Sequence, residues 1–98
     1  MLTNQEIHDQ ILKYMHESGV ALTNWYIGIA KFPKTRLFYD HNVKESGFWI
    51  YQDAGTNENA RTIGKMIMEK HNTQGNIDGG DEFTSFVYAY AITQKTKQ

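Results

Sequence analysis

The sequence predicts an α+β fold in which helices and a small three-stranded sheet share one core. An amphipathic helical pattern opens the chain, three short runs rich in β-branched and aromatic residues follow at intervals, and further helical patterns separate these runs. The predicted order is α-β-α-β-α-β. The 98 residues are enough for one core built from both kinds of element. We therefore interpret residues 1–98 as a single domain.

The first helix is expected over residues 4–18. Thr3 followed by Glu6 has the spacing of a capping box, in which each side chain accepts a hydrogen bond from the other residue's backbone N–H. Apolar residues then recur at helical spacing: Ile7, Ile11, Leu12 and Met15. The pattern ends before Gly19, which places the end of the helix there.

The first strand is expected over residues 22–30. Two sets of side chains alternate between its faces: Trp25, Ile27 and Ile29 on one face, and Tyr26, Gly28 and Ala30 on the other. Pro33 suits the first turn of a short second helix. That helix is expected to end near residue 41.

In the second half of the chain, strand-like and helical segments again follow one another. Residues 48–52 form an aromatic run typical of a strand, and residues 57–71 form a helical pattern that Thr56 is expected to cap. Gly64 lies inside that helix, where glycine costs about 1 kcal/mol relative to alanine, and this indicates a close backbone contact. Residues 72–85 are expected to be a loop and 86–92 a strand. The polar residues 94–98 are expected to fray.

Composition narrows the class of protein. The chain has no cysteine, which excludes disulfides, thiolate zinc sites and a cysteine nucleophile. It has no apolar run near the roughly 20 residues that cross a bilayer and no apparent targeting segment, so we expect a cytoplasmic protein with no membrane partner. The net charge of −1 gives no overall attraction to nucleic acid. The cations Lys31, Lys34, Arg36 and Lys44 make one region locally positive, whereas Asp78, Asp81 and Glu82 make the later glycine-rich loop acidic.

One segment resembles a known enzyme family. The tripeptide Tyr26-Ile27-Gly28, followed by Arg36 and His41, is similar to the second signature of the GIY-YIG nuclease superfamily. The resemblance extends to about Lys70 and implies a three-stranded antiparallel sheet flanked by helices. Ile27 and Gly28 would be the structural part of the motif on the central strand. The segment Phe86-Val87-Tyr88 resembles the family's other tyrosine element, so a permuted arrangement would place Tyr88 beside Tyr26.

The resemblance implies a metal-dependent endonuclease that hydrolyses phosphodiester bonds in DNA or RNA with Mg²⁺ or Mn²⁺. Arg36 would stabilise negative charge, because its planar guanidinium matches phosphate oxygens. Tyr26 would form a hydrogen bond in the site, Tyr88 would be the general base, and His41 would be a fourth catalytic residue. Tyr26, Arg36 and Tyr88 are expected to converge on one exposed face, with position 64 nearby.

Two positions depart from the family pattern. Gly64 stands where the family has its metal-binding glutamate, so the residues that would hold a metal are unassigned. The family's histidine commonly follows the arginine by four residues, but Asp40 occupies that position and His41 comes next. On a regular helix, one residue turns a side chain by about 100°. These departures favour an impaired or inactive nuclease-like domain.

Simpler interpretations remain open for the same residues. Arg36 has the spacing to form an exposed ion pair with Asp40, and tyrosines on strands often serve packing. Gly28 leaves room for substrate or for a neighbouring side chain. Besides the nuclease-like domain, two alternatives therefore stand: a non-catalytic module that binds nucleic acid or protein, and a small structural or partner protein with a coincidental motif.

Overall fold

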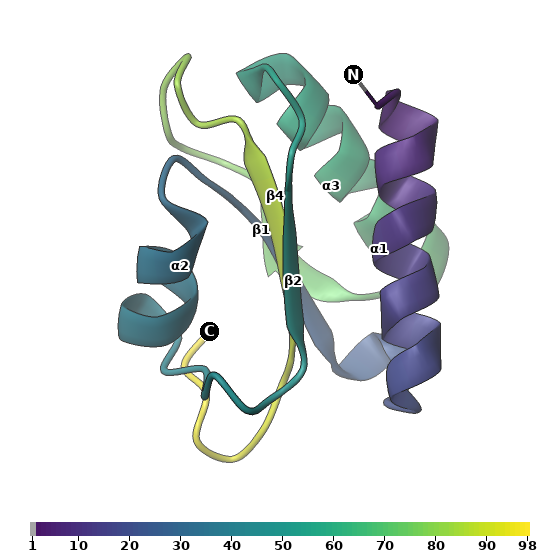
Figure 1. Ribbon diagram of the computed structural model, residues 1–98, viewed down its shortest axis with the longest axis vertical. Coiled ribbons are helices and arrows are strands. Elements are labelled where there is room, and N and C mark those ends of the chain that lie inside the picture. The colour runs from purple at the N-terminus through teal and green to yellow at the C-terminus, as the bar shows by residue number, and fades with distance from the viewer. Residues whose placement is uncertain (1) are drawn as a thin grey trace.

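A four-stranded mixed sheet lies between helices in the computed structural model, which describes residues 2–98 (Figure 1). The helical elements are α1 (Asn4–Ser18), the 3₁₀ turn η1 (Leu22–Asn24), α2 (Pro33–Thr35), the π-helical turn η2 (Arg36–Asp40) and α3 (Asn57–His71). The strands are β1 (Trp25–Ala30), β2 (Trp49–Asp53), β3 (Gln74–Asn76) and β4 (Phe86–Ala91). The predicted α+β class is confirmed.

The sheet itself differs from the prediction of three antiparallel strands. Its order is β2-β4-β1-β3, with β4 antiparallel to both β2 and β1, and with the unpredicted β3 parallel to β1. The segment Gln74-Gly75-Asn76 carries no β-branched or aromatic residue, so no side-chain pattern marks it as a strand. Pairing with β1 forms this strand, and Gly75 permits the pairing because a Cβ there would overlap the backbone of Ile27.

Helix ends follow the sequence signals closely. The Thr3 side chain accepts a hydrogen bond from the Glu6 N–H at 3.1 Å, and the Thr3 N–H donates to Glu6 Oε1 at 3.0 Å. Gly19 ends α1 in the left-handed conformation, with φ of 78°. The Thr56 side chain accepts from the Asn59 N–H at 3.0 Å and caps α3.

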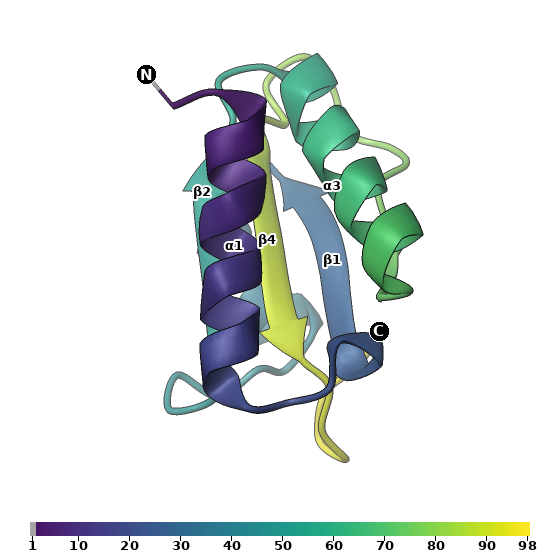
Figure 2. The ribbon, with the colours of Figure 1, turned by 90° about the vertical axis from the view of Figure 1, so that its right-hand side faces the viewer.

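Two separate cores lie on the two faces of the sheet. Helices α1 and α3 lie side by side over one face (Figure 2), where they bury a largely aliphatic core that includes Ile27 of β1. The short α2–η2 segment covers the other face (Figure 1), where the core is mostly aromatic. Its buried members are Tyr26, Ala30, Leu37, Val43, Tyr88 and Tyr90. Nowhere in residues 2–98 is a helix long and apolar enough to span a bilayer.

Candidate functional site

Strand pairing brings the two predicted tyrosines to one face of the sheet. In the antiparallel register of β1 and β4, Tyr26 lies opposite Tyr90, and Gly28 lies opposite Tyr88. The rings of Tyr26 and Tyr90 stack with centroids 5.3 Å apart. Tyr90 was not among the expected site residues, although its alternation with Tyr88 along β4 places both on the same face. The site is therefore built on the two central strands.

The space left by Gly28 is occupied by a neighbouring side chain. A Cβ at this position would overlap the phenol ring of Tyr88, including its hydroxyl oxygen. Of the two uses that the sequence leaves open for this gap, accommodation of a residue is the one that the structure shows. Gly28 thus allows Tyr88 to lie across β1 and to reach toward the covering helical segment.

His41 joins the tyrosine cluster from that segment. Its Nδ1 lies 2.6 Å from the carbonyl oxygen of Lys97, and its Nε2 lies 2.7 Å from the hydroxyl of Tyr88. Because a carbonyl only accepts, Nδ1 carries the proton, and Nε2 of the neutral ring accepts from Tyr88. The Tyr90 hydroxyl lies 3.0 Å from the same Nδ1. The chain segment predicted to fray therefore contacts the centre of this cluster.

The π-helical turn explains how His41 reaches this position. The His41 N–H donates to the Arg36 carbonyl at 2.9 Å, which is the i→i+5 bond of a π-turn. The wider turn holds one residue more than an α-helical turn. His41 consequently comes about one turn after Arg36 and is not rotated by the further 100° that a regular helix would impose. The expectation based on a regular helix was wrong at this point.

Burial decides the protonation of the cluster. It raises the pKa of Tyr88 to about 12, although the nearby Arg36 guanidinium acts in the opposite direction. Burial also raises the pKa of Tyr26 and Tyr90. At neutral pH these tyrosines keep their protons, and Tyr88 is a hydrogen-bond donor to His41. This environment opposes the general-base role that the resemblance implies for Tyr88.

A pH dependence of stability follows from His41. Burial lowers its pKa from the usual 6.5, and the Lys97 carbonyl opposes this only in part. Below about pH 6.5 the unfolded chain then binds more protons than the folded chain, so the free energy of unfolding should fall as the pH decreases. The pKa of His71 is lowered by burial as well and acts in the same direction. Urea denaturation between about pH 7.5 and pH 5.5 measures this slope.

The variant His41→Gln isolates the contribution of His41. Glutamine can still donate to the Lys97 carbonyl and accept from Tyr88, but it does not titrate. We expect a smaller loss of stability on acidification in this variant, with His71 accounting for what remains. An unchanged slope would contradict the buried, neutral state assigned to His41.

Arg36 is the one predicted catalytic residue that is exposed. Tyr26, Tyr88 and His41 are buried, so the expectation of one exposed face was wrong for the two tyrosines. The α2–η2 segment and the end of the chain cover them. The Arg36 side chain keeps 49% of its surface exposed, and its Nη1 donates to Asp40 Oδ2 at 3.1 Å. Such an exposed pair contributes little to stability, so the guanidinium can exchange its partner for an anion.

A hollow of about 350 Å³ lies beside Arg36 at the end of β1. Lys31 and Phe32 line it from the chain that follows β1, and Asp78, Gly79 and Gly80 line it from the loop before β4, so one carboxylate faces the two cations. Phe83 of that loop is nearby: Lys31 Nζ lies 5.5 Å from the ring centroid of Phe32 and 5.3 Å from that of Phe83. Both rings are largely exposed, at 64% and 62%. We call Lys31, Phe32, Arg36 and Phe83 the cationic–aromatic patch.

Only part of the cationic–aromatic patch could be predicted from the sequence. The local excess of cations includes Lys31 and Arg36, but Phe32 and Phe83 come from loops far apart in the chain. Trp25, a more conspicuous aromatic residue, is completely buried. Exposed apolar side chains that group into one patch can mark an interaction site, whereas single ones are ordinary.

The position expected to lie near this site is on the other side of the sheet. Gly64 packs on the face covered by α1 and α3, where an added Cβ would lie 2.6 Å from Ile77 Cγ2 and 3.8 Å from Ile27 Cγ2. Ile27 and Tyr26 point to opposite faces of β1, so position 64 is separated from Arg36 by the sheet. Across residues 2–98, no three histidine or carboxylate side chains are grouped closely enough to hold a metal ion.

Comparison with models of known protein families, with curated proteins and with solved structures gives no significant match for this chain. The GIY-YIG resemblance therefore stays a prediction from the residues that carry it. What the geometry adds is a buried tyrosine–histidine cluster beneath an exposed arginine, with aromatic rings beside it. This arrangement suits binding of an anion that also presents planar groups.

Proposed function

We propose that this protein is a GIY-YIG-like domain that binds nucleic acid through the cationic–aromatic patch and has no metal-dependent nuclease activity of its own. The observation that carries the proposal is the grouping of Lys31 and Arg36 with two exposed phenylalanine rings. Phosphates would bind the two cations, and bases would stack on Phe32 and Phe83. Stacking requires accessible base faces, so single-stranded DNA or RNA is the favoured partner.

The buried cluster supports this function by positioning Arg36. His41 is tied to the Arg36 carbonyl through the π-turn and to Tyr88 and Lys97 through its ring. These bonds hold the backbone of Arg36 in place while leaving its guanidinium exposed. Tyr26 and Tyr88 are thus assigned a supporting role here, and the place of Gly64 behind the sheet supports binding without cleavage.

Fluorescence anisotropy with labelled single strands tests the proposal. We expect Arg36→Ala to weaken binding by about tenfold, because one charge-assisted phosphate contact is lost. Affinity should fall by roughly sevenfold between about 50 and 200 mM salt if two phosphates are bound, with a shallower slope for this variant. Lys65→Ala, which removes an exposed cation on α3, is the matched control and should bind as the unchanged protein does.

The stacking contribution has its own variants. Phe32→Ala and Phe83→Ala should each weaken the binding of single strands about tenfold. The unchanged protein should bind duplex DNA more weakly than single strands, because the bases of a duplex are not accessible for stacking. Phe32→Leu keeps apolar bulk without a ring and should resemble Phe32→Ala if stacking is the cause. Absence of salt-sensitive binding would instead favour the structural or partner protein.

Incubation with Mg²⁺ or Mn²⁺ separates binding from catalysis. We expect intact strands after incubation with either ion. Cleavage that depends on the metal and disappears in Arg36→Ala would contradict the non-catalytic assignment and favour the endonuclease that the resemblance implies.

A further inference from the structure

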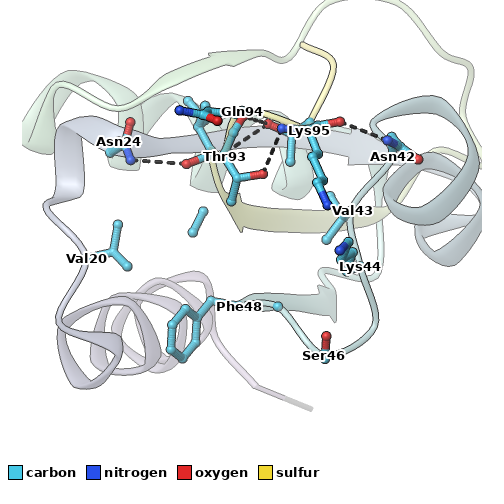
Figure 3. A pocket seen from close by; sticks show the side chains of 14 residues that line it. Val20, Asn24, Asn42, Val43, Lys44, Ser46, Phe48, Thr93, Gln94 and Lys95 are labelled. Carbon is cyan, nitrogen blue, oxygen red and sulfur yellow. Dashed lines mark hydrogen bonds between the residues drawn. The ribbon is translucent and has the colours of Figure 1, made fainter.

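A second hollow, a groove of about 580 Å³, lies at the opposite end of β1 from the cationic–aromatic patch. Figure 3 shows this groove between the chain that leads into β2 and the turn that follows β4. Asn24, just before β1, lines it, whereas the patch lies beyond the last residue of that strand. The two hollows share no residue. The volume of the groove is in the range of small-molecule sites.

The groove has an apolar surface that includes an exposed aromatic ring. Its apolar lining residues are Val20, Val43, Phe48, Ala91 and Ile92. Phe48 keeps 46% of its surface exposed. A planar group could stack on this ring and remove apolar surface from water.

Two lysines give the groove a positive charge. Lys44 and Lys95 reach it from opposite walls, and Figure 3 shows the Lys95 side chain extending toward Lys44. None of the lining residues is a carboxylate. The adjacent Lys95 side chain lowers the pKa of Lys44, first by hydrogen bonding and then by charge repulsion, so the two amines lie close together. An anion between them would relieve this repulsion.

Unused hydrogen-bonding groups line the same groove. Asn24 Nδ2 donates to the Ile92 carbonyl at 3.1 Å, and Asn42 Nδ2 donates to the Lys95 carbonyl at 2.8 Å, so both amides keep Oδ1 as an acceptor. The side chains of Ser46 and Gln94 also line the groove. These groups can form hydrogen bonds with the polar edge of a base. A purely aliphatic acid has no such edge and would leave them without a partner.

We propose that this groove binds a nucleoside monophosphate unit, with its base on Phe48 and its phosphate between Lys44 and Lys95. The unit is either a free nucleotide or the phosphorylated end of a strand, since both present the same chemistry. The inference goes beyond the proposed nucleic-acid surface, because it assigns a different site with a different ligand group. It can hold or fail independently of Arg36.

Isothermal titration calorimetry with AMP tests the site. We expect saturable binding of AMP, and binding at least about tenfold weaker for adenosine and for inorganic phosphate alone, because each lacks one of the recognised groups. The double variant Lys44→Ala/Lys95→Ala should lose at least about tenfold in AMP affinity. Lys34→Ala, which removes a cation outside the groove, is the control and should leave AMP affinity unchanged.

Further measurements show whether the ligand is a free nucleotide or a strand end, and whether the groove binds independently of the cationic–aromatic patch. Short strands with a 5′-phosphate that bind more tightly than AMP would identify a strand end, and the reverse order would identify a free nucleotide; either order supports the site. Arg36→Ala should leave AMP affinity unchanged, so failure of the patch would not affect this result. The proposal is overturned if AMP shows no saturable binding, if adenosine binds as tightly as AMP, or if the double lysine variant binds AMP normally.

Discussion

Substitution of Gly28 by alanine should destabilise the protein by about 3 kcal/mol. The added Cβ would overlap the phenol ring of Tyr88, which lies directly opposite in the pairing of β1 and β4. Tyr88 is almost completely buried and hydrogen-bonded to His41, so its ring has no free space into which to move. Urea denaturation, monitored by circular dichroism, measures the loss as a lower midpoint.

A double-mutant cycle identifies the cause of that loss. Tyr88→Leu removes the ring, so Gly28→Ala should cost much less in its presence than alone. Tyr88→Phe keeps the ring and removes only the hydroxyl, and the cost of Gly28→Ala should remain large. If Gly28→Ala costs as much in the Tyr88→Leu protein as in the unchanged protein, overlap with the Tyr88 ring is not the cause of the destabilisation.

Substitution of Gly64 by glutamate should destabilise the protein by about 3 to 5 kcal/mol and should not create nuclease activity. Position 64 is buried between α3 and the sheet, with Ile77 and Ile27 as neighbours. A carboxylate there would lie among apolar side chains without a cation to compensate its charge. Thermal unfolding measures the loss, and incubation of single strands with Mg²⁺ tests for cleavage.

Two controls accompany this variant. Gly64→Ala tests size without charge and should change stability by less than about 1 kcal/mol, because the shift of Ile77 is offset by the gain of about 1 kcal/mol that alanine has over glycine in a helix. Lys65→Glu introduces a carboxylate one residue away on the exposed side of α3 and should change stability by less than about 0.5 kcal/mol. Metal-dependent cleavage by Gly64→Glu would contradict the placement of this residue behind the sheet.

Helices were the most predictable elements of this fold. The capping box at Thr3 and Glu6 and the cap at Thr56 are local signals, formed by residues within one turn. The boundaries expected for α1 and α3 are those of the structure. Three strands could also be located, because aromatic and β-branched residues mark them. Strand β3 could not be predicted, since its backbone bonds to β1 and its side chains carry no strand pattern.

The proximity of the motif residues was more predictable than their burial. Tyr26, Arg36, His41 and Tyr88 do come together, but three of them are buried. Burial depends on the α2–η2 segment and on the contact of Lys97 with His41, and neither leaves a periodic pattern in the sequence. The π-turn is likewise unmarked in the sequence: it accommodates one extra residue between Arg36 and His41, and His41 contacts Tyr88.

The amino-acid sequence alone determined the α+β class, the ends of both long helices and the assignment of the tyrosines to one face of their strands. Local capping, side-chain alternation and hydrophobic periodicity act over a few residues, so they can be read without the fold. Only the tertiary structure decided the strand register, the place of Gly64 and the two hollows. Each of these joins segments distant in the chain, and such contacts depend on how the two faces of the sheet are packed.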